Sequence, residues 1–241
     1  MAPATAMTDD LGSTLARGAG YGLVAHGFRY PDRNWLESFP DEFRRDAWAE
    51  PLAALDGALS EMMIAVRATL DSAKPDRLLE VLQADFAAIF GHAVRGLCPA
   101  YELEYGQGEI IQRASDLADI AGFYAAFGLD LAGPSSERPD HVCVEAEFMV
   151  VLAAKEATGI ESGNEDLVTL SRDAQRKFLK CHLGQWVPAF ARRVMDAGGD
   201  GYYARLARFA DGLIAGECDR FGISLGSPYL ELRPPDAGEE S

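Results

Sequence analysis

The chain has 241 residues, 48% of them hydrophobic and 25% charged, and its 22 Lys and Arg against 38 Asp and Glu give a formal charge of −16. This composition is typical of a folded, globular protein and excludes a chain that is disordered over most of its length. The acidic surplus argues against a nucleic-acid groove and an anionic membrane surface, because both need clustered Lys and Arg. It favours a basic partner, or serves solubility alone.

Residues 1–20 show no pattern of an export signal, because they lack a basic segment followed by an apolar core. We therefore expect the protein in the cytoplasm. No apolar run approaches the length of a membrane-spanning helix, so we expect no membrane insertion. The cysteines lie far apart and form no CxxC pair, and we expect them to be small buried residues: Cys98, Cys143, Cys181 and Cys218.

Hydrophobic residues recur at steps of three and four from Leu52 to Leu70, which predicts one face of a long helix. A turn at residues 71–75 follows. The next run, over 78–90, predicts a second helix with Pro75 in its first turn. Two helices joined by so short a turn pack antiparallel.

The same spacing continues toward the end of the chain. No series of alternating strands bounded by hairpin turns is recognisable. We therefore predict an all-α fold. The further helical stretches are 117–127, 142–152, 167–181, 183–194 and 206–213.

Loops rich in Gly and Pro suggest how the chain is divided. We predict an N-terminal helical half over 11–132 and a C-terminal helical half over 142–233, joined by a hinge loop at 133–141. Residues 1–10 predict a frayed N-terminus and residues 234–241 an acidic tail. The hinge is too short to be a free linker, so we expect a compact bundle of two packed halves. One compact unit and two domains both remain open.

Motifs of the common enzyme classes are absent from the sequence, which has no phosphate-binding GxxxxGK[ST] loop, no GxGxxG and no GxSxG. His141 and Glu145 would share a helix face, but two ligands do not make a metal site. His26 and His92 have no second ligand or base at a telling distance, and His182 is expected to be a core residue. We predict no catalytic residue, no metal and no cofactor.

A first cluster of aromatic and acidic residues lies in the loop after the second helix. Tyr101, Glu102 and Tyr105 together can present apolar rings and a carboxylate to a partner. The alternative is structural: the rings anchor the loop on the core, and Glu102 stands at a helix start.

A second cluster lies where the hinge enters the next helix. It consists of Pro139, Asp140 and His141, with Glu145 one turn later. We expect Asp140 to be the N-cap of that helix, and His141 to gain a positive charge near its ordinary pKa of about 6.5. Together the two clusters predict an acidic, partly aromatic groove.

These stretches resemble the TorD/DmsD/NarJ group of redox-enzyme maturation proteins, the cytoplasmic chaperones dedicated to molybdenum-containing oxidoreductases. The sequences LADIAGFYAAFG and ERPDH look most like the chaperones that serve the type II dimethyl-sulfoxide-reductase branch, which includes selenate and chlorate reductases. Five stretches carry the resemblance, in the family's order: Asp85 to Phe90, Pro99 to Tyr105, Leu117 to Leu129, Glu137 to Met149 and Phe178 to Phe190.

The resemblance implies a chaperone that holds the immature catalytic subunit of a dimethyl-sulfoxide-reductase-family enzyme, and in many members its twin-arginine export leader, until the molybdenum cofactor is inserted. The family's leader-binding role maps onto the hinge residues 139–141 and the loop residues 101–102. Two guanidinium groups beside an apolar stretch are complementary to carboxylates beside aromatic rings. The predicted client-binding residues are Tyr101, Glu102, Tyr105, Pro139, Asp140, His141 and Glu145.

Two other classes of function stay open. One is a helical nucleotide-binding protein or small enzyme, against which the missing phosphate loop counts. The other is a structural adaptor. A chaperone should co-purify with a large molybdoenzyme subunit, whereas an enzyme need not, and an adaptor should bring other partners. The sequence leaves monomer and dimer both open.

Overall fold

The structure is a computed structural model that describes residues 4–38, 55, 57–72, 74–91, 96–106, 110–130 and 137–234. Within these ranges the regular secondary structure is helical, with two isolated β-bridges beside it. The predicted all-α fold is confirmed. In chain order the elements are α1 (Ala4–Gly27), α2 (Arg33–Ser38), α5 (Gly57–Leu70), α6 (Pro75–Phe90), the 3-10 turn η2 (Glu102–Glu104), α7 (Ile110–Ala126), α8 (Val142–Ser162), α9 (Glu165–Cys181), α10 (Leu183–Gly198) and α11 (Tyr202–Phe221).

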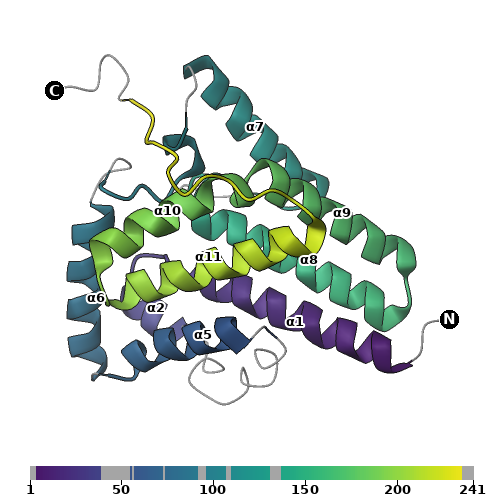
Figure 1. Cartoon of the computed structure of the whole chain (residues 1–241), viewed down its shortest axis with the longest axis horizontal. Coiled ribbons are helices and arrows are strands. Elements are labelled where there is room, and N and C mark those ends of the chain that lie inside the picture. The colour runs from purple at the N-terminus through teal and green to yellow at the C-terminus, as the bar shows by residue number, and fades with distance from the viewer. Residues whose placement is uncertain are drawn as a thin grey trace.

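Helices that are far apart in the sequence lie side by side in the bundle (Figure 1). α1 packs along α8 and α11, while α10 packs against α9 and α11. α5 lies on α11 and α6 touches α10. The predicted N-terminal half therefore packs directly on the predicted C-terminal half. The start of α7 projects beyond the other helices in Figure 1.

Most of the predicted helical stretches coincide with helices of the structure. The runs from residue 142 onward fall in α8 to α11, and the run 78–90 falls in α6. Residues 133–136 of the predicted hinge, 235–241 of the predicted tail and His92 lie outside the described residues. None of the helices described is both long enough and apolar enough to cross a bilayer.

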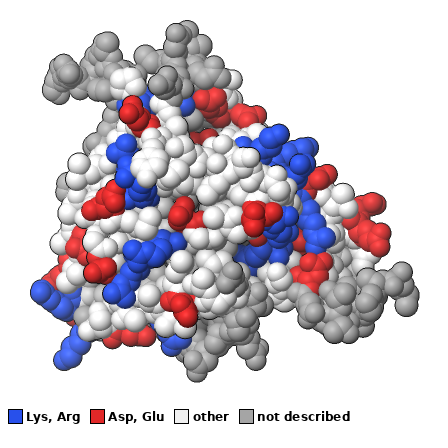
Figure 2. Space-filling view, in the orientation of Figure 1, with Lys and Arg blue, Asp and Glu red and all other residues white. Residues whose placement is uncertain are grey.

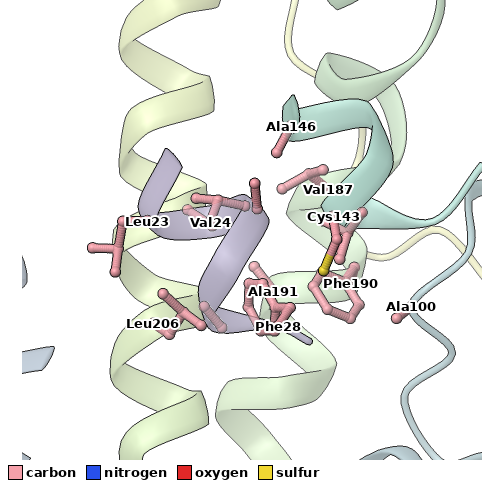
Figure 3. Packing of buried hydrophobic residues seen from close by; sticks show 14 of the residues in the cluster. Leu23, Val24, Phe28, Ala100, Cys143, Ala146, Val187, Phe190, Ala191 and Leu206 are labelled. Carbon is pink, nitrogen blue, oxygen red and sulfur yellow. The ribbon is translucent and has the colours of Figure 1, made fainter. Parts of the chain in front are cut away.

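The hydrophobic core is one continuous cluster that draws on both predicted halves. Phe28, just after α1, lies edge-on to Phe190 of α10, with ring centroids 5.1 Å apart. Figure 3 shows this contact where α1 lies beside α11. Phe90 and Tyr203 form a second edge-on pair at 5.2 Å. Aromatic pairs of this geometry add about 0.5 to 1.5 kcal/mol each beyond the burial of their area.

α1 approaches its neighbours closely because small residues line it. A Cβ atom at Gly27 would lie 2.7 Å from Cδ2 of Leu206, and one at Gly20 would lie 3.2 Å from Leu213. Large apolar side chains at helical spacing are correspondingly few in α1, so the sequence predicts no particular helix before residue 52. The helix begins at Ala4, inside the segment 1–10.

Three of the four cysteines are buried as expected, and the prediction for Cys181 is wrong. Cys181 is the last residue of α9 and is exposed. Phe178 and Leu179 fill the core at this end of the helix. Cys181 lies at the edge of the face that they bury.

A buried network of charged side chains joins α1 to the C-terminal helices. The fully buried Glu156 carboxylate of α8 accepts a hydrogen bond from Arg17 Nη2 at 3.1 Å. From α9, Arg172 Nε at 2.6 Å and Gln175 Nε2 at 2.7 Å donate to the same carboxylate. Arg17 Nε also lies 3.3 Å from Glu217 Oε1 of α11. Four helices thereby share one set of charges.

Burial acts to raise the pKa of the Glu156 carboxyl, but the hydrogen bonds from Gln175 and Arg172, together with the charges of Arg17 and Arg220, outweigh it. The pKa of Glu156 therefore lies below its ordinary value, and the side chain remains ionised within the core.

Replacing Glu156 by alanine should lower the free energy of unfolding by about 3 to 5 kcal/mol, because Arg17 and Arg172 would lose a buried partner. Glu161, exposed on the same helix, is the matched control, and its replacement by alanine should change that free energy by no more than about 0.5 kcal/mol. Urea denaturation followed by far-ultraviolet circular dichroism measures both. A loss in Glu156→Ala no larger than in the control would show that the network contributes little.

Candidate functional site

The two clusters predicted from the sequence lie side by side in the structure. Tyr101 and His141 form an antiparallel β-bridge. Backbone hydrogen bonds of 2.8 and 2.9 Å flank it. We call the two joined segments, residues 99–105 and 137–142, the loop pair.

Asp140 holds the loop pair together from inside. Its carboxylate is fully buried, and Oδ2 accepts a hydrogen bond from the Leu103 amide at 3.2 Å. Arg138 donates to both carboxylate oxygens, from Nε at 3.0 Å and from Nη2 at 2.7 Å. Burial raises the pKa of Asp140, and the charge of Arg138 opposes the rise. Asp140 thus joins the two segments.

The N-cap of α8 is His141, so the prediction that Asp140 has this role is wrong by one residue. His141 Nδ1 accepts a hydrogen bond from the Cys143 amide at 3.1 Å, which requires the imidazole to be unprotonated at that atom. Burial lowers the pKa of His141 to about 4. The side chain is therefore neutral near pH 6.5, contrary to the sequence-based expectation.

The exposed surface of the loop pair centres on Tyr101. The His141 ring packs edge-on against the Tyr101 ring at a centroid distance of 4.8 Å, and the Arg138 guanidinium lies 4.6 Å from the centre of the Tyr101 ring. The Tyr101 hydroxyl donates to Glu137 Oε1 at 2.8 Å. Aromatic ring, carboxylate and guanidinium thus already lie together at this surface, and Glu137 is exposed to solvent.

Glu102 points away from Tyr101, toward His182 at the junction of α9 and α10. His182 Nδ1 lies 3.1 Å from Glu102 Oε2, and its Nε2 lies 3.5 Å from Asp119 Oδ2 of α7. His182 is buried, as the sequence predicts, but it also carries a carboxylate beside each ring nitrogen. The sequence-based interpretation as a plain core residue misses this contact.

Glu145 lies deeper, beneath Glu102. It is fully buried, and Trp186 Nε1 donates to its Oε2 at 3.1 Å. Burial, and then the neighbouring carboxylate of Glu102, raise its pKa well above the ordinary value, which favours the uncharged acid. His141 and Glu145 therefore face different partners. Among the described residues no group of three or more His, Cys, Asp or Glu side chains could hold a metal ion.

The remaining predicted residues are held against the core. The Tyr105 hydroxyl donates to the Pro99 carbonyl at 2.8 Å, and its ring lies 5.4 Å from that of Trp186. The Pro139 carbonyl accepts from the Tyr124 hydroxyl at 2.7 Å. The anchoring role that the sequence left open describes Tyr105 well.

A pocket of about 540 Å³ adjoins the loop pair between α1, the end of α7 and α8. Its lining is largely apolar, with an ion pair between Arg29 and Glu147 among the lining residues. Tyr124, which contacts the loop pair through Pro139, is one wall. The hydrogen bond from Tyr124 to Pro139 therefore links this pocket to the loop pair.

A smaller pocket of about 280 Å³ lies on the other side, between η2, α7, the start of α10 and the C-terminal segment. Its acidic lining comes from Glu102, Asp116 and Asp119, with His182 and Trp186 beside them. Figure 2 shows acidic and basic side chains interspersed on the face that it presents, so the surplus of negative charge is not gathered into one patch there.

Residues 45–192 match the family model described as the nitrate reductase delta subunit. The chain belongs to the nitrate reductase delta subunit family. The resemblance to the TorD/DmsD/NarJ group is confirmed. The matched part of the chain includes both segments of the loop pair and the residues His182 and Trp186.

Several curated proteins are similar to this member of the nitrate reductase delta subunit family. A perchlorate reductase assembly chaperone protein of Dechloromonas aromatica is 25% identical over 229 residues, covering 92% of this chain and 97% of the relative. A selenate reductase assembly chaperone protein of Thauera selenatis is 30% identical over 144 residues, covering 59% and 72%. A chaperone protein TorD of Vibrio cholerae is 28% identical over 137 residues, covering 57% and 60%.

Replacing His141 by asparagine should flatten the pH dependence of stability, because asparagine can cap α8 without titrating. The folded-state pKa of His141, about 4, lies below the unfolded value, so the unfolded chain binds more protons between pH 4 and pH 6.5. Its stabilising contribution is complete above pH 6.5 and is lost as the pH falls toward 4. The loss amounts to about 3 kcal/mol at most.

Urea unfolding of the wild type and of His141→Asn across this range measures the difference. Equal slopes of unfolding free energy against pH in the two proteins would contradict the assigned protonation state.

Proposed function

We propose that the protein is an assembly chaperone that binds the immature catalytic subunit of a molybdenum-containing oxidoreductase in the cytoplasm. Family membership and relatives named as reductase assembly chaperones support the proposal. The observation that carries it is the loop pair, which holds an aromatic ring and a solvent-exposed carboxylate together and is linked through Pro139 and Tyr124 to an apolar pocket. The client belongs to the dimethyl-sulfoxide-reductase family in this proposal.

The predicted binding residues divide into two kinds by burial. Tyr101 and Glu102 are partly accessible and, with Glu137, can contact a client directly. The others position them and are Tyr105, Pro139, Asp140, His141 and Glu145. A client arginine would pack against Tyr101 and pair with Glu137, beside Arg138, which already lies on the same ring.

The apolar pocket suits the rest of a twin-arginine leader. Such a leader carries an apolar stretch beside its arginines, and the pocket lies beside Tyr124, which contacts Pro139 in the loop pair. Burial of the apolar stretch would supply most of the affinity, while the charged contacts would set its orientation.

The direct test is co-purification of the tagged protein from cells that make the client. A large molybdoenzyme subunit should be captured, and Tyr101→Ala or Glu137→Gln should weaken its binding about tenfold, the loss expected for one charge-assisted or cation-aromatic contact. Glu161→Gln, with the same change of charge on an exposed helix face, should bind as the wild type does. Capture of unrelated proteins, with no reductase subunit, would contradict the proposal.

Association with a synthetic leader peptide should slow as salt concentration rises, because the Debye length falls from about 30 Å at 0.01 M to about 8 Å at 0.15 M. The dissociation rate should change less, since buried apolar contacts govern escape. Stopped-flow fluorescence at several ionic strengths measures both rates. A peptide with both arginines replaced by glutamine should show a flatter dependence, and equal dependence of the two peptides would place recognition elsewhere.

A further inference from the structure

The chain beyond α11 returns across the bundle to the loop pair. Figure 1 shows this segment running over α10 toward η2. The Gly226 amide donates to the Gly184 carbonyl at 2.8 Å, and Arg192 Nε donates to the Pro228 carbonyl at 2.9 Å. We call residues 226–234 the C-terminal strap.

The end of the strap pairs with the loop pair as a strand would. Leu232 forms an antiparallel bridge with Tyr105. The Gly106 amide donates to the Glu231 carbonyl at 2.8 Å, and the Arg233 amide donates to the Glu104 carbonyl at 2.9 Å. These main-chain contacts do not depend on the identity of the strap side chains, so any extended peptide can make them.

Arg233 lines the acidic pocket, and its guanidinium is incompletely hydrogen-bonded. The side chain is 9% exposed, Nε donates to the Tyr105 carbonyl at 3.0 Å, and Nη2 is 3.8 Å from Asp116 Oδ2. Nη1 is buried with no hydrogen-bond partner among the described residues. A buried donor without a hydrogen-bond partner weakens the binding of the strap to the bundle.

The same pocket offers acceptors that Arg233 does not use. Glu102 and Asp119 also line it, each beside a ring nitrogen of His182. The buried His182 Nε2, 3.5 Å from Asp119, makes no hydrogen bond within the part of the chain described. The pocket has about 280 Å³ of open volume beside Arg233 and Leu230, which form one wall. Its chemistry is therefore that of a site for a guanidinium group carried on an extended backbone.

We propose that the C-terminal strap is a displaceable internal ligand, and that its site binds an extended peptide with arginine at the position of Arg233. The strap occupies the site in the free protein, and the peptide displaces it by pairing with Glu104 and Gly106. The proposal of a peptide-binding site depends only on the contacts described above. That a client segment is the displacing peptide in the cell rests on the proposed function.

The strap competes effectively because it is covalently attached to α11, even though its binding is weakened at Arg233. A short flexible tether holds its end at an effective concentration of the order of millimolar, so a free peptide must exceed that level or bind better. Removing the guanidinium of Arg233 should lower the competition, since a charge-assisted contact is lost. The site should then become open to peptides in solution.

The test uses the full chain and a labelled synthetic peptide with the sequence of residues 227–234. Arg233→Gln should bind this peptide about tenfold or more tightly than the wild type, as measured by fluorescence anisotropy. Arg208→Gln, which removes an exposed charge on α11, is the matched control and should bind as the wild type does. A peptide with its arginine replaced by glutamine should bind Arg233→Gln about tenfold less tightly.

Hydrogen exchange of the wild type gives a second readout that needs no variant. Excess peptide should speed exchange of the Arg233 amide, because the strap leaves, while the Gly106 amide stays protected by the carbonyl of the peptide. Equal peptide affinity in Arg233→Gln and the control, together with unchanged exchange at Arg233, would overturn the proposal. Peptide binding without capture of a reductase subunit would sustain this site and contradict the proposed function instead.

Discussion

The surface of the loop pair depends on one buried carboxylate. Asp140 has no exposed area, and without its partners its ionised form would cost several kcal/mol to bury. The Leu103 amide and the Arg138 guanidinium must therefore stay where they are. This in turn keeps Arg138 on the Tyr101 ring. Residues without solvent contact thus determine the geometry of residues that have it.

Large apolar residues made the fold readable from the sequence. α8 to α11 and α6 were predicted because Leu, Phe and Trp recur in them at helical spacing. α1 was not, because Gly20 and Gly27 take the place of large side chains where it packs closest. The spacing of large apolar residues predicts which side chains fill a core. It gives no signal where two helices touch because a glycine has no side chain.

The site was predictable in its residues and not in its pairing. Tyr101 and His141 were both singled out, but a bridge between segments so far apart depends on how the helices pack, which local spacing does not encode. The helix α8 begins one residue later than the sequence predicts, so His141 is its N-cap and Asp140 instead joins the two segments of the loop pair. The contact of His182 with Glu102 left no mark in the sequence near either residue.

α7 is joined to the bundle mainly through rings: Phe123 and Tyr124 lie against Phe148 and Phe178. The same helix and the turn after it contribute walls to both pockets, Tyr124 to the larger one and Asp119 to the smaller one. The walls of the two pockets are therefore not independent, because one helix reaches both sides of the loop pair.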